Sequence, residues 1–158
     1  MNKILRIIII LGLIFAASSC SYKPVFFQKA YNFKVEEVTL SGDKAVNSII
    51  SRNLRFIKSK DQIYKKKYLV KVDTTKERKI ISKDSEGDPS KFEIKITTEY
   101  EIINNEKLLV NRKIQQKSIY NNESDKFKLE QSEKIIIENL SEKISETIIS
   151  SIINLNDN

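Results

Sequence analysis

Apolar and polar residues alternate strictly over positions 92–102. Every second residue from Phe92 to Ile102 is apolar, aromatic or Thr, and the residues between them are Glu, Lys and Thr. A period of two predicts a β-strand with one buried and one wet face. A second alternating stretch covers 108–120, and Asn104-Asn105 suits a tight turn between the two stretches because Asn tolerates positive φ. We therefore expect a long hairpin over residues 91–120.

Two earlier stretches also predict strands. In the first, over 33–40, Phe33 and Val35 share one phase of the alternation, whereas Val38 and Leu40 share the other. This change of phase predicts a β-bulge near Glu36-Glu37. The second strand is centred on 68–72 and is expected to continue through 80–81, up to the dense cluster of turn-forming residues over 84–90.

Two stretches have helical spacing. Apolar residues recur every three or four positions over 44–58, and Asp43 before them is a suitable N-cap. A longer helix follows residue 124, where Ser124 or Asp125 can cap it. One stripe of this helix is almost entirely Ile and Leu, at positions 129, 136, 137, 140, 144, 148 and 152. Because β-branched residues are weak helix formers, we expect this stripe to gain its stability by packing on a sheet.

These elements predict an α+β fold with the order β-α-β-β-β-α. A right-handed crossover through the first helix and short turns between the later strands would place both helices on one face of a four-stranded sheet. No internal repeat divides the chain. We expect a single domain over residues 33–158.

The N-terminus has the layout of an export signal. Lys3 and Arg6 precede an apolar stretch over 7–15 that is shorter than the roughly 20 residues of a membrane-spanning helix. Ala17-Ser18-Ser19-Cys20 resembles the lipobox of bacterial lipoproteins, in which the Cys is lipidated and becomes the first mature residue. We therefore expect a cleaved signal peptide over 1–19, lipid attachment at Cys20 and a tether over 20–32. An ordinary signal followed by a free thiol is the alternative, and the position of the only Cys at this junction favours lipidation.

Composition argues against catalysis. The chain carries no His, one Cys and three Gly. The absence of His removes the usual general base and the commonest metal ligand, and one Cys excludes a multi-Cys metal site. We expect no enzyme activity, no metal and no cofactor other than the covalent lipid on Cys20.

Positive charge is concentrated in the middle of the chain. The formal net charge is +7, and residues 58–83 contain ten basic and three acidic residues. Such a stretch can attract polyanions, and those available to an exported lipoprotein are anionic lipid headgroups and phosphorylated glycolipids rather than nucleic acid. A solvated lysine surface is the alternative. The predicted contacts for phosphate groups are Lys65, Lys66, Lys67, Arg78 and Lys79, joined by Lys126 and Lys128 at the start of the last helix, with all seven gathered at one end of the sheet.

The mature N-terminus Cys-Ser-Tyr-Lys-Pro-Val-Phe, over 20–26, resembles the opening of the lipopolysaccharide-assembly lipoprotein family LptE in alphaproteobacteria. The helix over 46–54 and the hairpin over 92–120 are similar to elements of the same family. The resemblance implies an outer-membrane lipoprotein, anchored on the periplasmic side, that plugs the LptD β-barrel, helps it to assemble and takes part in lipopolysaccharide transport to the outer leaflet. It also implies lipopolysaccharide contact near Lys126 and Lys128. Ser21 after the lipidated Cys agrees with sorting to the outer membrane.

Two other classes stay open. One is a different envelope accessory lipoprotein, such as a barrel-assembly or lipid-shuttling subunit. The other is an envelope enzyme, which would need a base and a substrate cleft that the sequence does not indicate.

Overall fold

The computed structural model describes residues 33–55 and 66–157. The predicted signal peptide over 1–19, the tether over 20–32 with Cys20, and Lys65 lie outside the described residues. The same holds for positions 56–58, where the first helix was expected to end.

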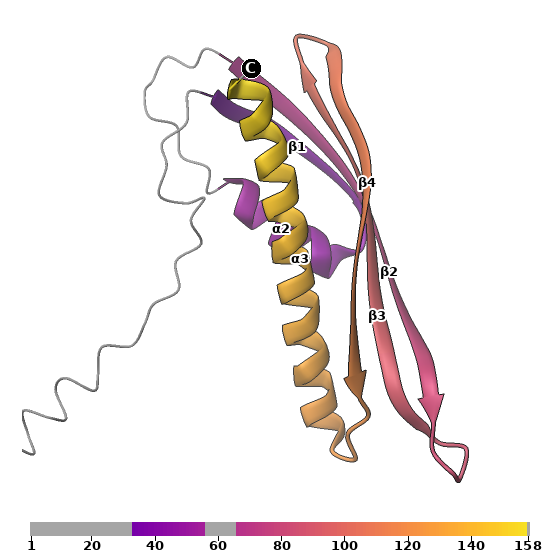
Figure 1. Ribbon diagram of the computed structural model, residues 1–158. Helices are drawn as coiled ribbons and strands as arrows, with labels where there is room; N and C mark the ends of the chain where they lie inside the picture. Colours follow the sequence, from indigo (N-terminus) through magenta and orange to yellow (C-terminus); the bar gives the residue numbers. More distant parts are fainter. Residues whose placement is uncertain (1–32, 56–65, 158) are drawn as a thin grey trace, which may run out of the picture.

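The elements follow the predicted order (Figure 1). They are β1 (Phe33–Gly42), α2 (Lys44–Arg55), β2 (Lys66–Lys83), β3 (Pro89–Asn104), β4 (Lys107–Asn121) and α3 (Lys126–Asp157). The strands form one sheet in the order β1-β2-β3-β4, in which β1 and β2 are parallel and the other pairs antiparallel. Both helices lie against the same face of this sheet (Figure 1). The predicted α+β fold is confirmed.

The bulge in β1 explains the change of phase in its sequence. Val35 pairs with Tyr68 and Glu37 pairs with Leu69, so Glu36 is the extra residue. The extra residue turns Val38 and Leu40 to the same face as Val35, and all three pack against the core.

The core lies between this face and the two helices. On β3 the alternation predicted from the sequence is confirmed, because every second residue from Phe92 to Ile102 is buried. From Leu140 onward, the Ile stripe of α3 packs into one core with Ile94, Ile96, Tyr100 and Ile102. Ile144, Ile148 and Ile152 are completely buried. The first ten residues of α3 include none that is buried, so this part of the helix contributes little to the core.

The junction between β1 and α2 is fixed by polar contacts. Oδ1 of Asp43 accepts hydrogen bonds from the backbone N–H groups of Ala45 and Val46, at 3.0 and 3.1 Å, as predicted for an N-cap. Asn47 is buried at the same place: its Nδ2 donates to the carbonyl of Ser41, and its Oδ1 accepts a hydrogen bond from the Thr74 hydroxyl. These contacts tie the start of the crossover helix to β2.

The hairpin turn between β3 and β4 lies one residue later than expected. Positive φ angles occur at Asn105 (48°) and Glu106 (63°), the two central residues of the turn, whereas Asn104 pairs with Lys107 at the end of the strands. Asn104 has a different role, because its Nδ2 donates a 2.7 Å hydrogen bond to the carbonyl of Lys67 on β2.

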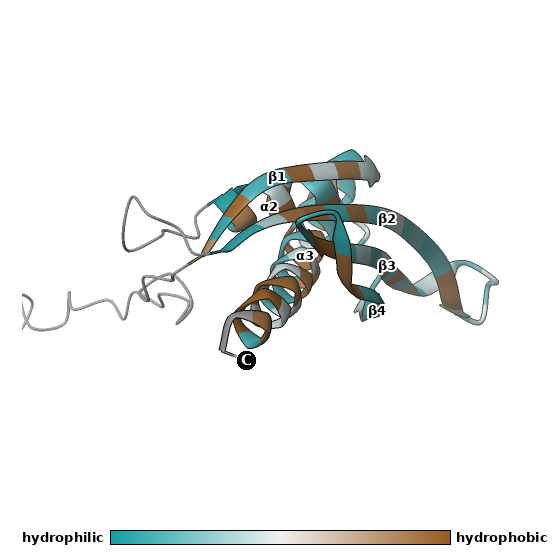
Figure 2. Ribbon diagram, turned by 90° about the horizontal axis from the view of Figure 1, so that it is seen from above, coloured by the Kyte–Doolittle hydropathy of each residue, from teal (hydrophilic) through white to brown (hydrophobic). Residues whose placement is uncertain are grey.

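The three long strands extend well past β1. β1 pairs with β2 only from Lys66 to Thr74, and residues 75–83 of β2 pair only with β3. The long strands curve and twist strongly in the view from above (Figure 2). The first turns of α3 lie beside this extension, where Asn122 donates its backbone N–H to the carbonyl of Ser90.

Candidate functional site

The face of the sheet away from the helices is mainly polar, although Ile119, opposite Glu93, is exposed on it. It carries cross-strand ion pairs between Glu77 and Lys95 (3.0 Å), between Glu93 and Lys117 (3.5 Å) and between Glu99 and Lys113 (2.6 Å). A shallow groove of about 260 Å³ crosses this face near the end of β1. Its lining residues are Thr39, Ser41, Lys71, Val72, Asp73, Glu99, Tyr100, Glu101 and Asn111. We call this surface the open face; it has the polarity of a surface that stays in water.

Two of the predicted phosphate contacts lie at the end of the sheet where α3 ends. The ammonium group of Lys66 donates a 3.0 Å hydrogen bond to the carbonyl of Leu155, in the last turns of α3. This places a positive charge at the negative end of the helix dipole. The neighbouring Lys67 forms a 3.1 Å ion pair with Glu36, the bulged residue of β1. Both side chains therefore have structural partners in the fold.

Arg78 of β2 belongs to a cluster that connects β2 to β3, β4 and α3. Its guanidinium lies 3.7 Å from the centre of the Phe92 ring, and its Nε donates to Glu133 Oε1 at 2.8 Å and to the Tyr120 hydroxyl at 3.0 Å. The Tyr120 hydroxyl donates to the same Glu133 oxygen at 2.6 Å. Burial, together with the hydrogen bond to Glu133, raises the pKa of Tyr120 to about 12. This cluster attaches the first half of α3 to the sheet.

The remaining predicted contacts differ from one another. Lys79 forms a 3.1 Å ion pair with Glu77 on the open face. Lys126 and Lys128 are exposed and have no acidic partner within the described part of the chain. The Asp125 carboxylate beside them accepts hydrogen bonds from the backbone N–H groups of Phe127 and Lys128. Of the two predicted candidates for the N-cap of α3, Ser124 and Asp125, the cap is therefore Asp125.

The seven residues were expected at one end of the sheet, and this placement is wrong for the six that the structure describes. Lys66 and Lys67 begin β2, whereas Arg78 lies twelve residues further along the same strand, about 40 Å away at the usual rise of a strand. Lys126 and Lys128 lie with Arg78 and Lys79 in the half of the molecule that contains the turn between β2 and β3 (Figure 1). The separation follows from the length of β2, one strand of 18 residues with Lys66 and Lys67 at its start and Arg78 and Lys79 in its second half.

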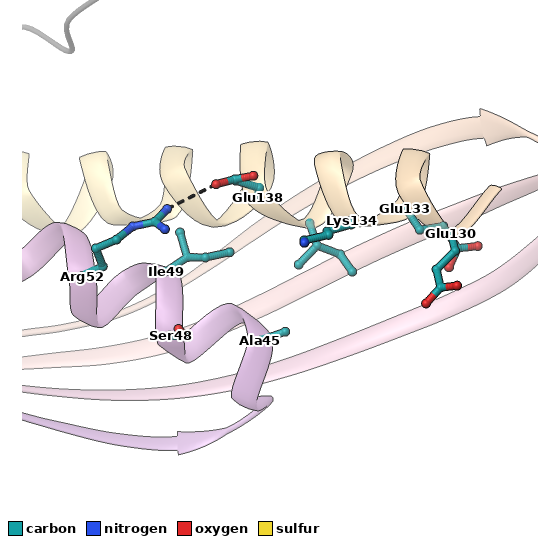
Figure 3. A pocket seen from close by; sticks show the side chains of 9 residues that line it. Ala45, Ser48, Ile49, Arg52, Glu130, Glu133, Lys134 and Glu138 are labelled. Carbon is teal, nitrogen blue, oxygen red and sulfur yellow. Dashed lines mark hydrogen bonds and ion pairs between the residues drawn. The ribbon is translucent and has the colours of Figure 1, made fainter. Parts of the chain in front are cut away.

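A groove between the two helices was not predicted. It has a volume of about 440 Å³ and opens where α2 and α3 diverge (Figure 3). Ile49 and Ile137 line it, and Arg52 closes one end through a 3.3 Å ion pair with Glu138. The other charged residues of the lining are Lys134, Glu130 and Glu133. Because acidic groups outnumber basic ones here, the groove is poorly suited to a phosphate group.

Large apolar side chains are exposed in three places. Ile80 and Ile81 lie on the part of β2 that β1 does not cover, Leu108, Leu109 and Ile119 lie on β4, and Phe127 and Ile135 lie on the first turns of α3. The most exposed is Phe127, with 67% of its surface accessible, between the two free lysines.

Neither described helix is long and apolar enough to cross a bilayer. Within residues 33–55 and 66–157, no three His, Cys, Asp or Glu side chains lie close enough together to hold a metal ion.

Comparison of the sequence with known protein families finds no match, and comparison with curated proteins finds no relative. Solved structures are similar in fold. Rare lipoprotein B from Shewanella oneidensis matches with a TM-score of 0.53 and 16% identity, over 76% of this chain and 98% of that one. An uncharacterized lipoprotein B from Nitrosomonas europaea matches with a TM-score of 0.54 and 13% identity, over 82% and 88% of the two chains.

A minor lipoprotein from Acinetobacter baumannii has the same arrangement, with a TM-score of 0.51 and 12% identity over 75% of this chain and 94% of that one. The described part of the chain thus has the fold of the rare lipoprotein B type of bacterial lipoprotein. At these identities the likeness is one of fold.

Proposed function

We propose that this chain is an outer-membrane lipoprotein of the LptE type, which plugs and helps to assemble an LptD-type β-barrel and takes part in lipopolysaccharide transport to the outer leaflet. The observation that carries the proposal is the combination of a lipobox ending at Cys20 with a mature domain that has the fold of rare lipoprotein B. In this proposal the protein acts by binding and not by catalysis, and it is anchored to the periplasmic side of the membrane.

The two faces of the sheet support the role of a plug. The helices bury one face, while the open face presents paired charges and Thr, which keep their hydration in a water-filled lumen. The interior wall of a membrane β-barrel is polar for the same reason. We therefore place the open face toward the barrel wall.

In this proposal, Lys126 and Lys128 contact the phosphate groups of lipopolysaccharide. Of the six candidates that the structure describes, only these two have no acidic or carbonyl partner in the described part of the chain. Asp125 occupies the free N–H groups at the start of α3, so the ammonium groups, and not the helix end, would hold the phosphate. Each such contact is weak in water, and the affinity depends on several acting together.

The proposal is tested by purifying the lipidated protein from native membranes in mild detergent and identifying bound protein and lipid by mass spectrometry. The expected result is one large outer-membrane β-barrel, together with lipopolysaccharide. The intact mass of the mature chain should exceed that of residues 20–158 by a diacylglyceryl group and an N-acyl chain.

Recovery of a different envelope assembly would instead favour an accessory lipoprotein of another system. A mass equal to that of the bare polypeptide would contradict lipidation at Cys20.

A further inference from the structure

Among the residues that the structure describes, no strand pairs with the outer edge of β4. The sheet ends at β4, which runs over 15 residues, about 50 Å at the usual rise of a strand. None of its residues is fully buried, although Val110, Ile114 and Tyr120 pack against the core on the helix side. By the geometry of an antiparallel ladder, every second residue of the strand directs its backbone N–H and C=O groups away from β3, toward this edge. Proteins usually shorten or cover such edges, because they are templates for pairing with another chain.

Exposed apolar side chains gather on the unpaired edges of the sheet. Of the seven large ones in the described ranges, two lie on residues 75–83 of β2 and three on β4, where no described strand pairs on one side. On β4 these are Leu108 and Ile119, both at least half exposed, and Leu109. An added strand would cover part of this apolar surface.

The charge on β4 indicates what kind of strand fits. The basic residues are Lys107, Arg112, Lys113 and Lys117, and the strand contains no acidic residue. Lys113 and Lys117 already pair with glutamates of β3 on one side. Lys107 and Arg112 have no acidic partner in the part of the chain that the structure describes.

We propose that the free edge of β4 binds an extended, acidic segment of a partner protein, which joins the sheet as a fifth strand. Backbone hydrogen bonds supply the affinity in this mode of recognition, and the side chains of the added strand supply the specificity. Acidic side chains placed opposite Lys113 and Lys117 would extend the ion pairs of the open face by one strand. A second copy of β4 is a poor partner, because like charges opposite each other destabilise a sheet.

The test uses the full lipidated chain in detergent micelles and a fluorescent ten-residue peptide in which Glu alternates with Val and Thr. A peptide with Lys in place of every Glu is the matched control. The acidic peptide should bind at least tenfold more tightly than the basic one, and binding should weaken as salt is raised. Hydrogen exchange should show new protection at every second amide of β4, since the amides between them already bond to β3.

Proline substitutions at two neighbouring residues of β4 test whether the peptide binds at the free edge of this strand. Gln115 and Gln116 are adjacent on β4, so one backbone N–H points to β3 and the other to the free edge. One of the variants Gln115→Pro and Gln116→Pro should therefore lower the stability of the fold. The other should keep the fold, as measured by circular dichroism, and lose peptide binding.

Equal binding of the two peptides, or protection that is absent from β4, would overturn the proposal. Binding that survives in both proline variants would overturn it as well, and so would a dimer joined through β4. None of these outcomes bears on the barrel partner, which is identified separately by purification from native membranes.

Discussion

Replacing Gly42 by Ala tests how tightly β1 closes onto β2 before the crossover helix begins. Gly42 has a φ of +92°, and a Cβ added to it would lie 1.8 Å from the carbonyl oxygen of Thr74. Gly87, in the turn between β2 and β3, provides a matched control. Its φ is +91°, but no atom in the described part of the chain lies within 4 Å of an added Cβ.

The two substitutions share one cost and differ in a second. Placing Ala at positive φ costs about 1 kcal/mol at either site. At Gly42 the strand end must also move away from Thr74, which breaks the 3.1 Å hydrogen bond from the Asp43 N–H to the Thr74 carbonyl and disturbs the cap of α2. Each of these losses is worth about 1 kcal/mol. We therefore expect Gly42→Ala to cost about 3 kcal/mol and Gly87→Ala about 1 kcal/mol.

Urea denaturation followed by circular dichroism measures both values on the mature chain. A difference of about 2 kcal/mol is easily resolved against a total stability of roughly 5–15 kcal/mol. Equal losses at the two sites would show that the junction between β1 and α2 does not depend on this close approach.

Three further predictions follow from the core, the cap and the basic end of α3. Ile96→Asp should unfold the domain, because Ile96 is completely buried. Thr97→Asp, on the open face, should change the free energy of unfolding by less than about 1 kcal/mol, and equal losses in the two variants would contradict the assignment of the two faces. Burial raises the pKa of Asp43, but hydrogen bonds from the Val46 N–H and Lys76 outweigh it, so the folded-state pKa lies below the ordinary value. The resulting stabilisation is complete above about pH 4 and is lost as the pH falls through the lowered pKa, and Asp43→Asn should flatten this dependence in acid titrations. Charge reversal at Lys126 and Lys128 should weaken lipopolysaccharide binding at low salt with no change in the circular dichroism spectrum; unchanged binding would mean that the two lysines are solvated surface.

The elements could be predicted because their patterns are local. A period of two over 92–102 requires a strand with two unlike faces, and the phase change in β1 requires one extra residue, which is Glu36. The caps at Asp43 and Asp125 were recognisable because a side-chain oxygen next to an apolar helical repeat satisfies N–H groups a few residues away.

The turn between β3 and β4 shows where local pattern fails. Both Asn104 and Asn105 tolerate positive φ, and the pairing of Asn104 with Lys107 places the turn on Asn105 and Glu106. This register depends on the whole hairpin, including the irregularity after Ile102, and not on the preference of one residue.

The roles of the basic residues depend on contacts between distant parts of the chain. Arg78 meets Glu133 across 55 positions and Lys66 meets Leu155 across 89, so neither partner is visible in the sequence near the lysine or arginine. A count of charges located a basic stretch, but the fold divides it along a strand and pairs five of its seven described members.

Site-specific photo-crosslinking in living cells tests the plug most directly. A photoreactive residue replaces Thr97, at the middle of the open face, and a second variant carries it at Glu142, on the exposed side of α3. If the open face lies against a barrel wall, the probe at Thr97 should give one prominent product with an outer-membrane β-barrel protein. Products with other partners only, or a barrel product from Glu142 and none from Thr97, would contradict this placement of the protein.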